Sequence, residues 1–356
     1  MLVRAGRNAP MAKTMLVPES WSKQTVDLPK PWIDMYSYCN SVMEPWDGPA
    51  ALAMTDGRWV CAVLDRNGLR PMRYVVTGDG LLIAGSEAGM VHVDEANVKE
   101  KGALGPGQLL AVDMDEGRLY HDTEMKDLLA ASQDFGAWVG KINELDEDLA
   151  KAVEAPLFAG AELRKRQIAA GYTIEELEQI LAPMAEDGKA ILASMCDDTP
   201  SAVLSEKYRP LSHFFRQNFS QVTNPPIDSL REFRVMSLKT RFGNLKNVLD
   251  ESSAQTEILV LDSPFVGNVQ FQRLLENFNA PMVEIDCTFP SGAEAGELQT
   301  SLNRIRSEAE DAVRSGAGHL VLTDQHANDA KVAVPMILAT SAVHSWLTRQ
   351  GLRTFT

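Results

Sequence analysis

Three arginines and a proline surround an Asn-Gly pair in the segment LDRNGLRPMRY, residues 64–74. Arg66, Arg70 and Arg73 could together form a working cationic site. They could equally decorate a tight hairpin, because Asn-Gly supplies the positive φ angles that such turns need. The surrounding elements have to decide between these two interpretations.

Three aspartates stand at the ends of apolar, strand-like runs in the last hundred residues: Asp262, Asp286 and Asp324. Ligands of open parallel sheets bind beyond the carboxyl ends of the strands, so these acids could hold a metal or a polar ligand. Asp is also a common cap of a following helix or turn, and we favour this second interpretation. No glycine-rich phosphate loop accompanies the acids, since SGAGH (315–319) precedes a strand.

The thiols and imidazoles show no spacing typical of a metal site. Cys39, Cys61, Cys196 and Cys287 lie far apart without a CxxC pair, and the histidines form neither HxxxH nor HExxH. A zinc site, an iron–sulfur site or a disulfide framework is therefore not expected, and the cysteines are interpreted as reduced, mostly buried thiols. Cys196 has two acids beside it, whereas a reactive thiol needs positive neighbours.

Charge and hydropathy restrict the classes of partner. The net charge is −15, and this argues against nucleic acid or an anionic membrane surface as the main partner. Residues 1–16 lack the apolar core of a signal peptide, and the apolar run at 333–343 is too short to cross a bilayer. We expect a soluble, cytoplasmic protein of roughly two domains.

The elements that must position these residues fall into three regions. Short apolar runs predict an antiparallel meander over residues 50–122. Its turn dipeptides are Asp56-Gly57, Asn67-Gly68, Asp79-Gly80 and Glu116-Gly117.

Residues 125–190 are predicted to be helical. Thr173 and Glu176 have the spacing of a capping box, and Pro183 should end or bend the helix that they start. Apolar residues of this helix are expected on one face: Ile174, Leu177, Ile180, Leu181 and Met184.

The C-terminal region predicts an α/β arrangement. The runs at 257–262, 281–286 and 319–324 are short, nearly continuous apolar strands, which is typical of a parallel sheet covered on both faces. An amphipathic helix between the second and third strands carries Leu302, Ile305, Ala309, Ala312 and Val313.

Several of these segments resemble the large subunit of bacterial glutamate synthase, in the expected order along the whole chain. The first group resembles its glutamine amidotransferase domain: LVRAGRNAPMAKTMLVPESW, YCNSVMEPWDGPAALAMTDGR, LDRNGLRPMRY and IAGSEAGMV. The second group resembles its central domain: MAEDGK, SMCDDTP, FFRQNFSQVTNPPIDSLRE, VMSLKTRFGNL and MILATSAVHSWLTRQGLRTFT.

The resemblance implies a fold and a set of boundaries. Residues 1–135 would be the C-terminal part of a class II amidotransferase domain with an N-terminal-nucleophile (αββα) fold and an antiparallel sheet. Residues 136–255 would be a helical connector and the start of the central domain. Residues 256–356 would be its α/β portion with a mainly parallel sheet. The expected class is therefore α+β followed by α/β.

The resemblance also implies a chemistry. In the family, an amidotransferase domain hydrolyses L-glutamine, and ammonia passes through a tunnel to a domain with FMN and a 3Fe-4S cluster, where 2-oxoglutarate becomes L-glutamate. Electrons reach the bacterial type from NADPH through a small flavoprotein (beta) subunit with FAD.

The family's nucleophile is a cysteine at the mature N-terminus, activated by its own α-amine. Here residue 2 is Leu, and Cys39 lies inside YSYCNSV. The family's oxyanion Asn-Gly and its substrate-binding acid precede this sequence. No catalytic, cofactor-binding or metal-binding residue can therefore be carried over, and we expect a fragment that is inactive alone.

The segment at 64–74 is accordingly interpreted as a hairpin that supports the nucleophile strand. Asn67-Gly68 would turn the chain and Pro71 would fix the exit. The residues assigned to this structural motif are Asp65, Arg66, Asn67, Gly68, Arg70, Pro71, Ser86 and Glu87.

Two alternatives stay open, and the first belongs to a different class of protein. A non-catalytic interaction module could use SQVTNPPIDSLRE (220–232) as its contact surface. Another class II amidotransferase, such as an asparagine synthetase, shares only the Asp-x-x-Gly turn and matches nothing after residue 125. Unpaired sheet edges on either side also predict aggregation.

Overall fold

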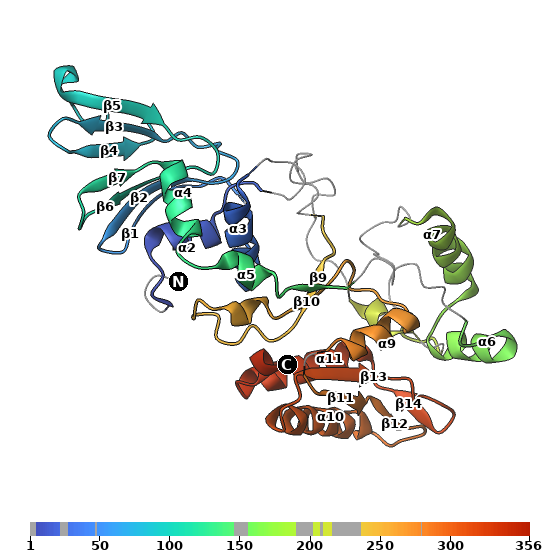
Figure 1. Ribbon diagram of the computed structural model, residues 1–356. Helices are drawn as coiled ribbons and strands as arrows, with labels where there is room; N and C mark the ends of the chain where they lie inside the picture. Colours follow the sequence, from blue (N-terminus) through green and yellow to red (C-terminus); the bar gives the residue numbers. More distant parts are fainter. Residues whose placement is uncertain are drawn as a thin grey trace. The chain divides into compact units, whose positions relative to one another are not determined.

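The computed structural model divides the chain into two compact units (Figure 1). One contains Met1–Leu145 and Asp228–Pro264, and the other contains Asp146–Ile227 and Phe265–Thr356. The structure describes residues 5–21, 28–46, 48–145, 156–189, 202–206, 209–215, 236–278 and 280–356.

A four-stranded antiparallel sheet in the order β1-β2-β6-β7 forms the centre of the first unit. Its strands are β1 (Ala51–Thr55), β2 (Trp59–Leu64), β6 (Leu109–Asp113) and β7 (Arg118–Tyr120). The predicted turn between β1 and β2 forms because Asp56 Oδ1 accepts the amides of Arg58 and Trp59, at 3.0 and 2.7 Å. Gly57 there has φ of +100°.

A second antiparallel sheet has the order β4-β3-β5. Its strands are β3 (Arg73–Thr77), β4 (Leu82–Gly85) and β5 (Val98–Ala103). The predicted runs are therefore strands, but the predicted single meander is wrong. Both edges of β2 are occupied, by β1 and β6, so β3 cannot pair with it. Residues 65–72 connect two sheets and are not the turn of a hairpin.

Four helices pack with the first sheet around one apolar core. They are α2 (Ala9–Leu16), α3 (Lys30–Val42), α4 (Asp122–Ala130) and α5 (Phe135–Val139). Asn8 begins α2, since its side-chain oxygen accepts the Met11 amide at 2.8 Å. Tyr38 of α3 is fully buried against the rings of Phe135 and Trp138, with centroids 5.2 and 5.1 Å away.

The strand predicted at 257–262 belongs to the first unit, which corrects its assignment to the C-terminal sheet. It forms β10 (Leu259–Leu261), parallel to β8 (Asn143–Glu144) and antiparallel to β9 (Thr240–Phe242). The turn η5 (Ser253–Thr256) before it contacts α3 and α5. Arg7 also donates to the carbonyls of residues 248–250.

The second unit contains the parallel pair β11 (Met282–Asp286) and β13 (His319–Thr323). The helices α10 (Glu297–Arg314) and α11 (Met336–Arg349) share one core with these strands, and the predicted apolar face of α10 is buried. The remaining elements of this region are α9 (Asn268–Glu276), β12 (Thr288–Pro290), β14 (Lys331–Ala333) and η6 (Arg353–Phe355).

The region predicted as helix up to residue 190 consists of separate pieces. After α4 and α5 come α6 (Gly160–Ala169), the π-helical turn η3 (Glu176–Leu181) and α7 (Ala182–Asp187). Thr173 and Glu176 form the predicted capping box, with reciprocal amide contacts of 2.8 and 3.1 Å.

Of the two outcomes predicted for Pro183, an end or a bend of the helix, the end is wrong, because the helical run passes through Pro183 into α7. A π-helical turn stands directly before the proline. The apolar face predicted here is largely exposed, as at Ile174, which is 58% exposed. Two further short 3₁₀ turns are η1 (Glu95–Asn97) and η4 (Leu211–Phe214).

None of the helices that the structure describes combines the length and the apolar character needed to cross a bilayer.

Candidate functional site

Asp65 ties three segments of the first unit together. Its side chain is buried, and its carboxylate accepts the amides of Ala50 at 3.0 Å and Asn67 at 2.7 Å. Its carbonyl oxygen accepts the amides of Gly68 at 3.1 Å and Gly107 at 2.8 Å. Asp65 therefore fixes the start of β1, its own turn and the turn at 105–108 by four hydrogen bonds.

Gly68 and Gly107 permit this arrangement because neither has a side chain. Gly68 has φ of +60°, and a Cβ there would lie 2.8 Å from the ring and 2.9 Å from the backbone of Pro106. Gly107 has φ of +71°, and a Cβ there would lie 2.3 to 2.6 Å from Glu19. Both positions need the left-handed conformation and an approach closer than any side chain allows.

The arginines of the segment do not gather into one cationic site. Arg66 is buried, whereas Arg70 and Arg73 are exposed, as is Pro71. Arg73 lies on the second sheet. The segment connects two sheets, and its buried end is an aspartate held by backbone amides.

Ser86 and Glu87 lie apart from this turn, at the end of β4 in the second sheet, and both are exposed. Glu87, Arg73 and Met90 line a shallow groove of about 370 Å³ over β3, β4 and β5. The structure thus brings residues 65–68 together in one turn, and it places Ser86 and Glu87 on the other sheet.

A buried ion network lies next to the Asp65 turn, and the sequence did not predict it. Lys126 Nζ contacts Glu19 Oε2 at 3.0 Å and Asp122 Oδ2 at 2.8 Å, with its side chain 2% exposed. Tyr36 donates its hydroxyl to Glu19 Oε1 at 2.5 Å. Burial and the neighbouring Glu19 raise the pKa of Tyr36 well above its usual value. The network joins α3, α4 and the chain after α2.

Lys13 connects this network to the Asp65 turn. Its ammonium is fully buried and donates to the carbonyl of Gly107 at 2.6 Å, while the amide of Gly107 donates to Asp65. Burial and, to a smaller extent, Lys126 lower the pKa of Lys13 to about 8. A single lysine inside the apolar run PMAKTML was the signal available in the sequence.

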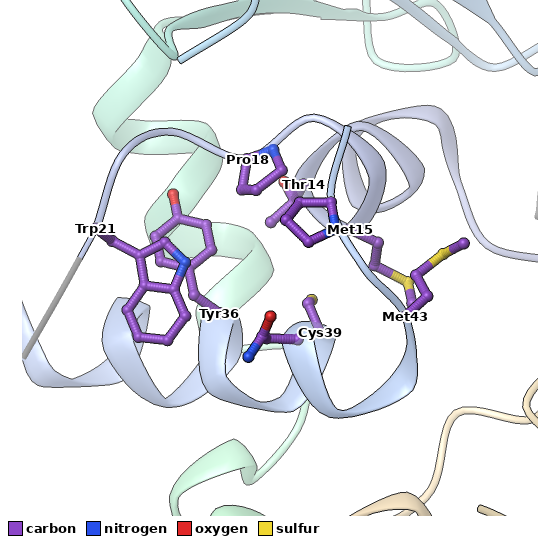
Figure 2. Close-up of a pocket in the computed structure, with 9 residues that line it drawn as sticks. Thr14, Met15, Pro18, Trp21, Tyr36, Cys39 and Met43 are labelled. Atoms are coloured by element: carbon purple, nitrogen blue, oxygen red, sulfur yellow. The ribbon is translucent and has the colours of Figure 1, made fainter. Parts of the chain in front are cut away.

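Cys39 lines a narrow pocket (Figure 2). The stacked rings of Trp21 and Tyr36 lie on one side of Cys39, and the side chain of Met43 lies on the other. The space between these side chains leaves no room for a water molecule. Burial raises the pKa of the Cys39 thiol to about 12. Such a thiol is protonated at neutral pH and is a poor nucleophile.

The other described thiols, Cys61 and Cys287, are also buried and also have raised pKa values. Burial raises the pKa of Cys61 to about 12 and that of Cys287 to about 11. Both side chains are buried, as predicted. Cys196 and most of FFRQNFSQVTNPPIDSLRE, including 220–232, lie outside the described residues.

The three strand-end aspartates do not converge. Asp262 lies in the first unit and pairs with Lys239 at 3.3 Å. Asp286 accepts the amide and hydroxyl of Thr288 at 3.0 and 2.7 Å, so it caps a turn as we favoured. Asp324 is exposed at the end of β13. Within the described ranges, no three His, Cys, Asp or Glu side chains are grouped as a metal would require.

Comparisons with known proteins divide the chain in the same order as its two groups of motifs. Residues 1–138 match the family model for class-II glutamine amidotransferases. Residues 165–356 match the family model for the glutamate synthase central domain. The chain therefore carries parts of both domains, and its small sheets and helices are of the α+β kind. The class that these matches define is a chain that joins part of a class-II glutamine amidotransferase domain to part of a glutamate synthase central domain.

The chain belongs to the glutamate synthase family. It is 57% identical over 361 residues to the glutamate synthase [NADPH] large chain of Azospirillum brasilense, covering 100% of this chain and 24% of that protein. It is 38% identical to the corresponding large chain of Bacillus subtilis, covering 99% and 23%. It is also 38% identical to the ferredoxin-dependent glutamate synthase of spinach chloroplasts, covering 100% and 22%. The chain thus spans about a quarter of the length of these curated relatives.

Proposed function

We propose that this chain is part of the large subunit of a cytoplasmic glutamate synthase, which makes L-glutamate from L-glutamine and 2-oxoglutarate. The observation that carries the proposal is the match to two domain models in the order of the family, with 57% identity to one large chain. The name of that relative supports NADPH as the electron donor. From the family resemblance we further propose a small flavoprotein subunit with FAD as the partner. We keep 1–135, 136–255 and 256–356 as the proposed boundaries.

Within that subunit, we propose that the first unit is the structural half of an αββα amidotransferase domain. Its support is the geometry of Asp65, which accepts four backbone amides from the residue before β1 and from two turns, and of Lys13, which attaches the turn at 105–108 to α2. The motif holds sheets in place and takes no part in bond cleavage. We propose the same scaffold role for the remaining motif residues, of which Ser86 and Glu87 lie at the end of β4 in the second sheet.

We further propose that the nucleophile, FMN and the 3Fe-4S cluster belong to other parts of the large subunit. Cys39 is buried in α3, Cys61 in β2 and Cys287 between β11 and β12, and their pKa values are raised to between about 11 and 12. Residues arranged in this way do not fit an iron–sulfur cluster, which needs several thiolates close together. The central domain portion would connect the two active centres.

Glutaminase activity tests the proposal. The purified 356-residue chain is incubated with L-glutamine, and release of ammonia and glutamate is measured against a heat-killed sample. We expect no turnover. Alkylation by a glutamine-like electrophile, followed by peptide mapping, should leave Cys39, Cys61 and Cys287 unlabelled.

The family role is tested separately with the gene product that includes the genomic sequence on both sides. It should form glutamate from glutamine and 2-oxoglutarate with NADPH when the small subunit is added. Turnover by the 356-residue chain alone, or rapid labelling of one of its three described thiols, would refute the scaffold assignment.

A further inference from the structure

A groove between α10 and α11 is the strongest unassigned site in the described part of the chain. The two helices pack against each other over the core of the second unit. The groove has a volume of about 220 Å³, and its apolar lining residues are Leu302, Leu338, Ala342 and Trp346. Its polar rim consists of Arg306 from α10 and Ser341, Ser345 and Arg349 from α11.

Arg306 supplies the main electrostatic argument. A guanidinium has five N–H donors and no acceptor. Nη1 of Arg306 donates to Asn303 Oδ1 at 3.2 Å, but Nε is shielded from solvent and has no acceptor among the described residues. Because Nε is shielded, an oxygen ligand in the groove would be bound by the other N–H donors of this guanidinium, which lines the groove.

The α11 side of the groove carries a row of hydrogen-bond donors. Ser341, Ser345 and Arg349 are each four residues apart, and positions four apart lie on the same side of a helix. All three are exposed. Two hydroxyl donors and a second guanidinium therefore border the same space as Arg306.

Trp346, which lines the groove, donates to the carboxylate of Glu310, and this carboxylate already has a cationic partner, Arg314. Glu310 Oε2 accepts the indole N–H of Trp346 at 2.6 Å, and Glu310 Oε1 pairs with Arg314 at 2.7 Å. Those two contacts occupy the Glu310 carboxylate. The rim of the groove is thus cationic in a chain of net charge −15.

We propose that this groove binds a small oxyanion, a carboxylate or a phosphate group. Arginine forks and hydroxyls are the donors that such groups use, because paired N–H donors match two oxygens. The volume of about 220 Å³ is below the range of about 300–1,000 Å³ for drug-sized ligands, which restricts the ligand to a small acid or inorganic phosphate. The proposal does not depend on the proposed glutamate chemistry.

Isothermal titration calorimetry of the full chain tests the proposal, with inorganic phosphate and succinate as probes at constant ionic strength. At least one probe should bind one-to-one with a Kd below about 10 mM. Arg306→Gln and Arg349→Gln should each weaken that binding about tenfold or more. Arg273→Gln, an exposed arginine of α9 outside the groove, is the matched control and should leave Kd unchanged.

Binding of phosphate alone would identify a phosphate site, and binding of succinate alone a carboxylate site. Circular dichroism melts of all variants check that each one folds. The proposal is overturned if neither probe binds the folded wild-type chain, or if Arg273→Gln weakens binding as much as the two groove variants.

Discussion

At the scale of single residues, the turn motif depends on backbone contacts that side chains would block. Asp65 accepts two amides with its carboxylate and two with its carbonyl oxygen. Two of those donors are Gly68 and Gly107, which lie against Pro106 and Glu19. Arg70 is exposed although it belongs to the same segment. The chemistry of this motif is therefore hydrogen bonding to the main chain.

Gly68→Ala should reduce the free energy of unfolding more than Gly117→Ala. The two glycines have nearly the same φ, +60° and +61°, but a Cβ at Gly117 meets nothing within 4 Å. At either site, we expect the left-handed conformation to reduce the free energy of unfolding of the alanine variant by about 1 kcal/mol. At Gly68, overpacking against Pro106 should reduce it by about 1–3 kcal/mol more. Urea titration measures both, and equal losses would contradict the steric argument.

Lys126→Met should destabilise the chain by about 3–5 kcal/mol, because it leaves Glu19 and Asp122 without their buried cation. Lys30→Met is the control. Lys30 also pairs with a carboxylate, Asp34 at 2.6 Å, but its side chain is 79% exposed, so the loss should stay below about 0.5 kcal/mol. Chemical denaturation of both variants measures the difference. A loss at Lys126 as small as that at Lys30 would show that the network contributes little.

At the scale of elements, pairing depends on which strand edges are available. β2 is enclosed by β1 and β6, so the strand that follows it, β3, begins another sheet. β10 lies beside β8 and β9, while β11 and β13 pair with each other. Local turn chemistry was a better guide, since the capping box at Thr173 and the turn at Asp56 formed as their residue types indicate.

Thr173→Ala should loosen the helical segment that the capping box begins. The hydroxyl of Thr173 accepts the Glu176 amide at 3.1 Å, and loss of such a cap costs about 1 kcal/mol. Amide hydrogen exchange of residues 174–181 should accelerate about fivefold. Thr348→Ala is the control, because its hydroxyl donates to the His344 carbonyl within α11 and caps nothing. Unchanged exchange in the first variant would mean that the box does not hold this helix.

At the scale of the whole chain, the first compact unit is built from two separated stretches of sequence. Residues 236–264 return to it, where Gln255 and Thr256 are completely buried and Tyr38 donates to Gln255 at 3.3 Å. The family boundaries at 138 and 165 therefore do not coincide with the limits of this unit. Domains defined along the sequence and units defined by packing differ here.

A chain of residues 1–145 should melt at a temperature at least about 10 °C lower than a chain of residues 1–264. The shorter chain loses η5, which contacts α3 and α5, and also β9 and β10, of which β10 pairs with β8. Circular dichroism and near-ultraviolet melts compare the two. Equal melting temperatures would show that the returning stretch adds no stability to the unit.

The sequence by itself determined most strands, the capping box, the buried face of α10 and the burial of the described thiols. These follow from periodicity and turn chemistry, which act over a few residues. It also determined the family, through motifs that extend along the chain. Sheet membership, the Lys13 and Lys126 network and the groove between α10 and α11 were decided only by the tertiary structure. Each joins residues far apart in sequence, and no local pattern specifies which edge, charge or helix face will meet another.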